Sequence, residues 1–269
     1  MLDKYKDHMK VNGFSNQTMM DYISRVKKFL RNVDLENINN DGVQKYFLEL
    51  QENLKHSTIN KHRDTLKHFF EFLEKDIKLP KGLSVTQKIP PYITEEYFEK
   101  EIIPVAERLF MGKPKALAIL YFLFYTGLRR DELTLLKRDD IDFEKRTFKI
   151  YMPKVEREKY GYFTQKVEDV IIRYFNTEEE ETNAFNTTGQ QIKGIFKKLK
   201  PFFKDITKFC PRLFRHSFAT LCRQRGVAME DIKEFMGHSS INTTMRYAHS
   251  NPEKLGKIYN ENIEKADKQ

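Results

Sequence analysis

The chain has 269 residues, a formal net charge of +9 and a pI near 9.2, and at one domain per ~150 residues this length predicts two domains. The basic surplus suits a protein that binds a polyanion such as nucleic acid, although charge alone does not identify the partner. The sequence has no run of ~18 apolar residues that would be long enough to span a membrane, and no apolar signal-peptide core follows Met1. We therefore expect a cytoplasmic protein.

Residues 1–79 are predicted to form a domain made only of helices. The polar run at 15–18 can cap a helix, because the apolar residues that follow recur at three- and four-residue steps. Further helices are expected from about Asp41 and from Ser57 or Thr58.

The outer face of the third predicted helix is basic. It carries Lys61, His62, Lys67 and His68. A charged helix face is most often only solvated, but Lys61, Lys67 and His68 are candidate DNA contacts.

Residues 80–91 contain three prolines and one glycine without sustained periodicity, which is typical of an interdomain linker. A second domain, residues 92–269, is expected to be mostly helical. One helix should begin after Thr94, and a strongly apolar helix should run from Ala116 to Thr126.

A small β-hairpin is expected inside the second domain. Apolar and polar residues alternate from Arg146 to Met152, which is the pattern of a half-buried strand. Residues 160–164 can return as the partner strand. The predicted fold class is therefore mainly α, with a small antiparallel β-sheet.

Three motifs of the second domain contain the groups that phosphodiester chemistry requires. They are TGLRRDEL at 126–133, RLFRHSFAT at 212–220 and GHSSINTTMRY at 237–247. Without a metal, cleavage needs positive charge on the non-bridging oxygens, a nucleophile and a proton donor for the leaving oxygen. Arg129 and Arg215 can supply permanent charge, and Tyr247 can attack if cations stabilise its phenolate. A helix is expected to begin about His216, so that Arg215 and the unpaired N–H groups of the helix start could face an anion together.

With these motifs in this order and at these separations, the chain resembles the tyrosine recombinase, or phage integrase, family, including its Xer-like and λ-integrase-like members. The resemblance covers nearly the whole chain. It implies a helical, SAM-like core-binding domain over 1–79 and a catalytic domain over 92–269. That domain would end in a tail helix that docks either in cis or on a neighbouring subunit.

The same resemblance implies an activity. The family cuts and rejoins double-stranded DNA through a 3′-phosphotyrosyl intermediate, as a tetramer on DNA, and needs no cofactor and no metal. Cys210 and Cys222 also lack metal-ligand spacing, so we interpret them as reduced thiols.

The resemblance assigns roles to individual residues. Arg129 and Arg215 would clamp the scissile phosphate while Tyr247 attacks it. His238 would donate a hydrogen bond to a phosphate oxygen, and Glu132 would brace the site from behind.

The proton donor is expected on the β-hairpin. In the run 154–159, Lys154 matches the family's catalytic lysine and is the candidate general acid. Lys149, Lys159 and Lys166 are nearby alternatives, because hairpin lengths vary.

Arg212 stands where most relatives carry a histidine, three residues before the second clamping arginine. A guanidinium stays protonated, so Arg212 is a catalytic candidate that can stabilise charge but cannot accept the proton of Tyr247. Water, the phosphate or another residue must take that proton. His216 is interpreted as a capping or packing residue.

Several functions remain open. Within the family, an integrase of a virus or plasmid and an Xer-like resolvase are not distinguished. Outside it, the chain could be a catalytically silent DNA-binding protein, with Arg212 marking lost activity, or a type IB topoisomerase-like enzyme.

Overall fold

The computed structural model describes residues 1–33, 38–85, 90–152, 156–177, 182–238 and 240–248. The chain divides into two compact units, Met1–Gln87 and Lys88–Gln269, each with its own hydrophobic core. The division falls inside the stretch predicted as a linker. The tail helix expected at the end of the second domain lies outside the described residues. No helix within the described ranges is long and apolar enough to cross a lipid bilayer.

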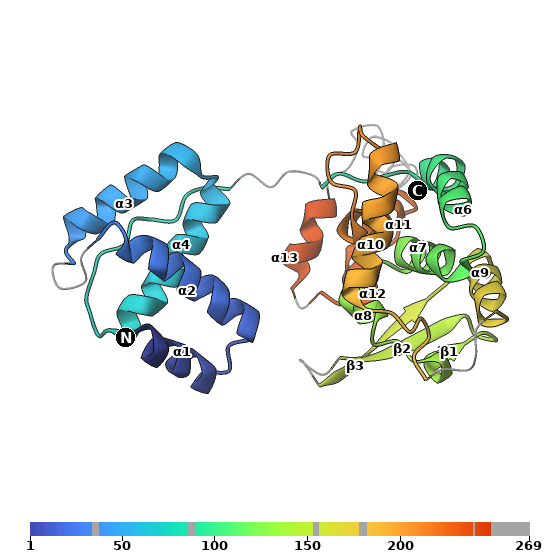
Figure 1. Ribbon diagram of the computed structural model, residues 1–269, viewed down its shortest axis with the longest axis horizontal. Helices are drawn as coiled ribbons and strands as arrows, with labels where there is room; N and C mark the ends of the chain where they lie inside the picture. The colour runs from blue at the N-terminus through green and yellow to red at the C-terminus, as the bar shows by residue number, and fades with distance from the viewer. Residues whose placement is uncertain (34–37, 86–89, 153–155, 178–181, 239, 249–269) are drawn as a thin grey trace, which may run out of the picture. The chain divides into compact units, whose positions relative to one another are not determined.

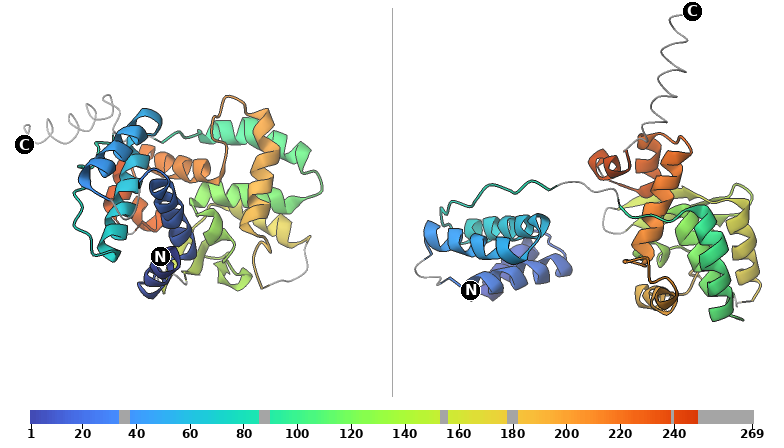
Figure 2. Two further views of the ribbon diagram at one scale, coloured as in Figure 1. Left: turned by 60° about the vertical axis from the view of Figure 1, so that its left-hand side comes forward. Right: turned by 90° about the horizontal axis from the view of Figure 1, so that it is seen from above.

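The described part of the first unit is helical, as predicted (Figure 1). Its helices are α1 (Leu2–Val11), α2 (Asn16–Leu30), α3 (Asn40–Asn53) and α4 (His56–Phe72). The Ser15 hydroxyl accepts the Thr18 N–H at 3.2 Å, which confirms the predicted cap of α2. Helix α4 packs against the other three, and further views of these helices are given in Figure 2.

The chain after α4 runs back along that helix. Arg63 Nε donates to the carbonyl of Pro80 at 2.8 Å, and the Asn60 amide bonds both the N–H and the carbonyl of Leu83 at 2.8 Å. The first residues of the predicted linker are therefore held to the first unit by side chains of α4. The prolines and the glycine from which the linker was predicted do not indicate this attachment.

The second unit is mostly helical, with one small sheet. Its elements are α5 (Glu95–Tyr97), η1 (Phe98–Ile102, a π-helical stretch), α6 (Ile103–Leu109), α7 (Pro114–Thr126), α8 (Arg130–Leu133), η2 (Arg138–Asp140), β1 (Ile141–Asp142), β2 (Thr147–Met152), β3 (Arg157–Tyr162), α9 (Gln165–Phe175), α10 (Gly189–Leu199), η3 (Lys200–Phe202), α11 (Pro211–Gln224), α12 (Met229–Met236), α13 (Ile241–Thr244) and η4 (Met245–Tyr247).

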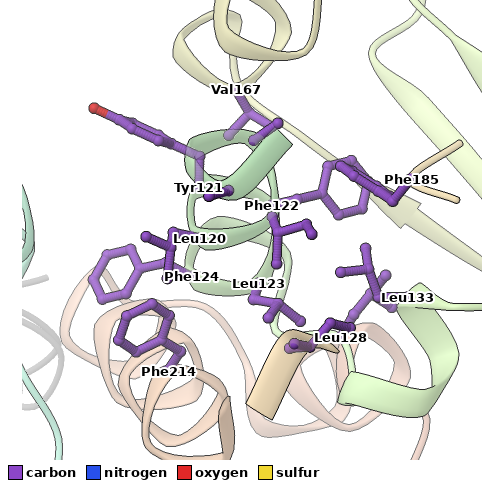
Figure 3. Packing of buried hydrophobic residues seen from close by; sticks show 14 of the residues in the cluster. Leu120, Tyr121, Phe122, Leu123, Phe124, Leu128, Leu133, Val167, Phe185 and Phe214 are labelled. Atoms are coloured by element: carbon purple, nitrogen blue, oxygen red, sulfur yellow. The ribbon is translucent and has the colours of Figure 1, made fainter. Parts of the chain in front are cut away.

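Helix α7 lies at the centre of this unit. Phe122 and Phe124 on it are fully buried, and it packs against α9 on one side and α11 on another. Figure 3 shows the side chains of α7 meeting Val167 of α9 and Phe214 of α11. A helix that is apolar on all sides is expected to be buried in this way.

The sheet is antiparallel in the order β1-β2-β3, which confirms the predicted hairpin and adds a short third strand. Phe148 and Ile150 of β2 face the core, as the alternation predicted. Gly161 lies opposite Phe148, and a Cβ there would come within 2.1 Å of the Phe148 ring, so only glycine fits.

Helix α11 begins at Pro211, not near His216 as expected. Proline suits the first helical position because its missing N–H has no partner there anyway. Arg212 therefore lies in the first turn and Arg215 in the second. The expectation that Arg215 would face an anion together with the unpaired N–H groups of a helix start was wrong.

Candidate active site

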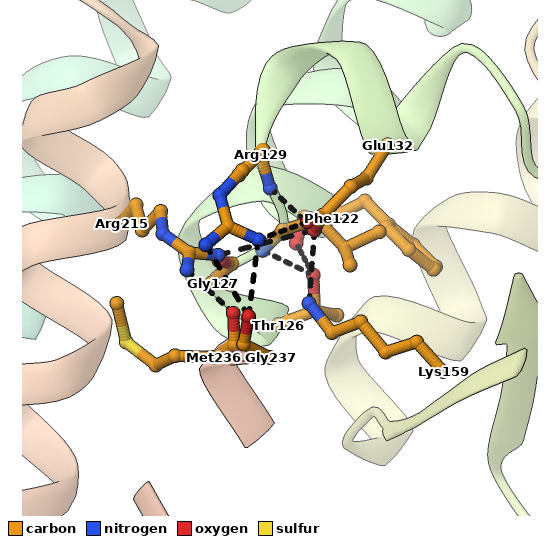
Figure 4. Close-up of polar contacts among 10 residues, drawn as sticks. Phe122, Thr126, Gly127, Arg129, Glu132, Lys159, Arg215, Met236 and Gly237 are labelled. Carbon is orange, nitrogen blue, oxygen red and sulfur yellow. Dashed lines mark hydrogen bonds and ion pairs between the residues drawn. The ribbon is translucent and has the colours of Figure 1, made fainter. Parts of the chain in front are cut away.

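Arg129 is positioned by a sharp turn between α7 and α8. Gly127 ends α7 with a left-handed φ of 64°, and a Cβ on it would lie 2.3 Å from a ring carbon of Phe218, so this position requires glycine on both counts. The Arg129 guanidinium ion-pairs with the Glu132 carboxylate and donates to the carbonyl of Gly237 at 3.3 Å (Figure 4).

Glu132 is a buried anion surrounded by cations. Its Oε2 accepts from Lys159 Nζ at 2.9 Å, accepts the Arg129 N–H at 3.0 Å and lies 3.9 Å from Nη1 of Arg215. Burial by itself would raise the pKa of Glu132, but Lys159, the Arg129 N–H and Arg215 together lower it to about 2. Burial lowers the pKa of Lys159 to about 8, with Glu132 acting in the opposite direction.

Arg215 connects three segments from the second turn of α11. Its Nη1 donates to the carbonyl of Gly127 at 2.6 Å, and its Nη2 donates to the carbonyl of Met236 at the end of α12. Burial and the neighbouring Arg129 lower the pKa of Arg215 to about 10, so it stays charged at neutral pH. Glu132 therefore sits between the two arginines that were predicted to clamp a phosphate.

His238 follows the left-handed Gly237 that ends α12. Its Nδ1 is hydrogen-bonded to the Thr244 hydroxyl at 2.8 Å, which leaves the Nε2 edge for another partner. Burial, followed by the charges of Arg215 and Arg129, lowers the pKa of His238 to about 4. The ring is therefore neutral at neutral pH.

Tyr247 lies in η4 with its hydroxyl against α11. The hydroxyl oxygen and Nδ1 of His216 are 2.6 Å apart, and the two rings are tilted with centroids 5.9 Å apart. Burial raises the pKa of Tyr247, whereas the charges of Arg215, Arg246 and Arg212 oppose that shift. His216, interpreted from sequence as a capping or packing residue, is thus in direct contact with the candidate nucleophile.

These side chains share one pocket of about 630 Å³. Its wall includes Leu128, Arg129, Arg130, Asp131, Lys193, Cys210, Pro211, Arg212, Arg215, His216, His238, Thr243, Arg246 and Tyr247. Five of the six catalytic candidates therefore converge, although their motifs are far apart in sequence. Sequence reasoning assigned no role to Lys193 or Arg246; the position of Arg246 directly before Tyr247 was the available signal.

The sixth candidate, Lys154, lies outside the described residues. Lys159, one of the alternatives, lies on β3 opposite Ile150 and reaches Glu132. Residues directly opposite each other on antiparallel strands point to the same face of the sheet, so Lys159 is buried together with Ile150.

The DNA-contact candidates of the first unit divide into two kinds. Lys61 and Lys67 are exposed, and Lys67 lies 3.9 Å from Glu71. His68 is partly buried and is hydrogen-bonded to the Tyr5 hydroxyl at 2.9 Å. His62, expected on the outer face, is instead buried and bonded to the Tyr46 hydroxyl at 2.8 Å, because tyrosines of other helices supply partners that the helical pattern cannot reveal.

A second basic surface of the first unit was not predicted. A cavity of about 900 Å³ is lined mainly by residues of α2, with some from α1 and α4. Its basic residues are Lys6, Arg25, Lys27, Lys28, Arg31 and His62. The signal for it was the run of basic residues at the end of α2 and directly after it, Arg25, Lys27, Lys28 and Arg31.

Comparison with known proteins gives a consistent result. The profile of the phage integrase family matches residues 97–254, and that of the phage integrase N-terminal SAM-like domain matches residues 2–76. A tyrosine recombinase of Thermosipho africanus is 27% identical, over 93% of this chain and 94% of that protein. Tyrosine recombinase XerC of Pediococcus pentosaceus is also 27% identical, over 96% of each.

A solved structure has the same fold. The Tn1549 transposon integrase in complex with transposon right end DNA superposes with a TM-score of 0.75 at 17% identity, over 97% of this chain and 98% of that one.

Proposed function

The chain belongs to the phage integrase family, and from this premise we propose how its pocket cuts and rejoins DNA. The protein is a tyrosine recombinase, a site-specific DNA strand transferase. The proposal is supported above all by one observation: Arg129, Arg215, His238 and Tyr247 line a single pocket whose wall is rich in cations.

In the proposed reaction a phosphodiester of double-stranded DNA enters this pocket. Arg129 and Arg215 neutralise its non-bridging oxygens, and His238 donates a hydrogen bond from Nε2. The Tyr247 oxygen attacks phosphorus, a P–O bond to tyrosine forms, and the bond to the 5′ oxygen breaks. The phosphotyrosyl bond keeps the energy of the broken linkage, so a 5′ hydroxyl of another strand can reverse the step without a cofactor.

Glu132 would hold the two arginines in place. Its carboxylate ion-pairs with Arg129 and lies 3.9 Å from Arg215, and Lys159 balances its charge at 2.9 Å. Such an arrangement lets the pair of guanidiniums face a phosphate without repelling each other out of position.

We keep Lys154 as the proposed proton donor to the 5′ leaving oxygen. Lys159 is buried and ion-paired with Glu132 at 2.9 Å, so it fits a supporting role better. A substrate with sulfur at the 5′ bridging position separates the two, because a thiolate leaves without protonation. The substrate should restore cleavage by Lys154→Ala and should fail to restore cleavage by Lys159→Ala.

DNA binding would use basic surfaces on both units. On the first unit the proposed contacts are the α2 cavity, including Lys28 and Arg31, together with Lys61, Lys67 and His68. Exposed lysines and arginines of this kind position a duplex through its phosphates. The proposed working assembly is four subunits on two DNA segments.

The experiment is a search for a covalent adduct. Duplexes tiled across the DNA that flanks the gene are nicked a few nucleotides beyond each tested position, so that the short cleaved fragment is lost and the intermediate accumulates. The wild-type chain should form an adduct at one site, through a 3′ phosphate. Tyr247→Phe should bind the same duplex equally well and form none.

The rival functions give different outcomes. Binding without any adduct by the wild-type chain would indicate a silent DNA-binding protein. An adduct accompanied by relaxation of supercoiled DNA, but never by exchange between two duplexes, would indicate a topoisomerase-like enzyme.

A further inference from the structure

Tyr247 must lose its proton in order to attack, and few groups in the pocket can accept it. Guanidiniums and ammoniums have no lone pair to offer. That excludes Arg129, Arg130, Arg212, Arg215, Arg246 and Lys193, which make up most of the polar wall.

Four candidate bases remain: Asp131, Cys210, His216 and His238. Asp131 is exposed and ion-paired with Arg130 at 2.6 Å, and His238 uses its Nδ1 on Thr244. The thiol of Cys210 is only a weak acceptor. Among the described residues that line the pocket, His216 alone has a basic nitrogen at hydrogen-bond distance from the Tyr247 hydroxyl, at 2.6 Å.

We propose that His216 is the general base of the reaction: its Nδ1 takes the hydroxyl proton of Tyr247 as the tyrosine oxygen bonds to phosphorus. The inference rests on the proposed function of the pocket and adds the missing proton acceptor. In cleavage the O–H bond of tyrosine breaks and an N–H bond on Nδ1 forms, while the 5′ oxygen leaves with a proton from the general acid. In rejoining, the imidazolium returns its proton to the departing phenolate.

The charge state of His216 agrees with this role. The charged and titratable groups around it are Arg212 and Arg215 of α11 and Arg246 and Tyr247 of η4. Burial, followed by Arg212, Arg246 and Arg215, lowers the pKa of His216 to about 4. At neutral pH the ring is therefore neutral, and the tautomer with the proton on Nε2 accepts the tyrosine O–H at Nδ1.

The same arginines make the pKa of His216 depend on whether a DNA phosphate is bound in the pocket. An incoming phosphate is an anion that the arginines neutralise, so it offsets the positive field that lowers the pKa of His216. The histidine should become a stronger base only when DNA occupies the pocket. Tyr247 would then stay protonated until a phosphodiester is present to be attacked.

The position of Arg212 on α11 explains its effect on the pKa of His216. Arg212 and His216 are four residues apart on α11, so they lie on the same side of the helix one turn from each other. Arg212 lines the pocket and acts on His216 through its charge, while the proton transfer itself falls to His216.

The test is single-turnover cleavage of the nicked duplex by His216→Asn, in which the amide keeps a hydrogen-bond acceptor near the hydroxyl but cannot take a proton. The cleavage rate should fall about 10²- to 10⁴-fold, with unchanged DNA affinity. His216→Gln is assayed in the same way, in case the first variant fails to fold.

A second readout separates a base from a merely structural residue. Replacing Tyr247 by 3,5-difluorotyrosine gives a more acidic phenol, which needs less help to lose its proton. This replacement should recover most of the activity of His216→Asn. It should not recover His238→Asn, in which a phosphate contact is lost instead.

Two results would overturn the inference. One is a His216→Asn chain that cleaves as fast as the wild type. The other is a slow variant whose defect is unchanged by the acidic phenol, since that would be expected of a residue that only positions Tyr247. If the wild-type chain itself forms no adduct, it is the proposed function that fails.

Discussion

Lys159 and Glu132 form an ion pair at 2.9 Å in which only 3% and 8% of the two side chains are exposed. Buried charges are tolerated when they are paired, and removal of one partner leaves the other without compensation. Because Arg129 and Arg215 share the same carboxylate, this pair joins the stability of the second unit to the geometry of the proposed phosphate clamp.

Glu132→Gln should destabilise the second unit by about 3–5 kcal/mol, because Lys159 and Arg215 would lose the carboxylate that neutralises them. Urea unfolding of the full chain, followed by circular dichroism, measures the change. Glu107→Gln, at an exposed position on α6, is the matched control and should change stability by no more than about 0.5 kcal/mol. Equal losses in the two variants would contradict the prediction.

From the low pKa of the Glu132 carboxylate we expect the free energy of unfolding to depend on pH. The pKa of Glu132 is about 2 in the folded chain, below its ordinary value of 4.5, so its stabilising contribution is complete above 4.5 and is lost as the pH falls toward 2. The difference in unfolding free energy between the wild type and Glu132→Gln should therefore shrink across this range. A difference that stays constant would show that the carboxylate is not held in its charged form.

Gly127→Ala should destabilise the protein more than Gly226→Ala. Both glycines have a positive φ, 64° and 89°, so each alanine incurs about 1–2 kcal/mol of backbone strain. Only the Cβ at 127 also meets Phe218, at 2.3 Å, whereas nothing lies within 4 Å of a Cβ at 226. The extra loss should be about 1–3 kcal/mol by urea unfolding, and adding Phe218→Ala should recover part of it in the first variant only.

The sequence predicted those elements whose patterns are local. The apolar run of α7, the cap of α2 and the alternation along β2 each carry their own signal, so their positions were confirmed. The start of α11 was misplaced because the prediction followed the motif at 212–220 and did not use Pro211, a residue type that suits the first position of a helix.

What could not be predicted depends on contacts between distant segments. His216 contacts Tyr247, and His62 contacts Tyr46. The two residues of each pair are too far apart in sequence for helical periodicity to predict the contact. Lys159 reaches Glu132 because the strand register places it opposite the buried Ile150. One residue of slippage along the hairpin would have turned it to the other face.

Lys28→Ala should weaken DNA binding equally for specific and unrelated duplexes, because a lysine in the α2 cavity is proposed to contact phosphate rather than a base edge. The slope of log affinity against log salt should fall in magnitude by about 0.9. Lys45→Ala, at an exposed position on α3 outside the cavity, should leave the slope unchanged. Equal effects of the two substitutions would indicate that only net charge matters.

Arg212→Met should shift the pH dependence of cleavage without abolishing cleavage. Arg212 is, after burial, the largest cause of the low pKa of His216, so its removal raises that pKa and makes the imidazole protonated at higher pH. Since a protonated histidine cannot accept the tyrosine proton, the rate should begin to fall at a higher pH than in the wild type.

The measurement is the single-turnover cleavage rate under subsaturating DNA, from about pH 4 to 8, because this rate reports groups of the free enzyme. Arg212 is the largest charge that lowers the pKa of His216, whereas the largest charges that lower the pKa of His238 are those of Arg215 and Arg129. A shift in Arg212→Met therefore identifies His216 as the titrating group. Arg138→Met, whose guanidinium stacks on Phe175 away from the pocket, is the control and should reproduce the wild-type curve. An acid limb that does not move when Arg212 is replaced would mean that His216 does not carry the proton.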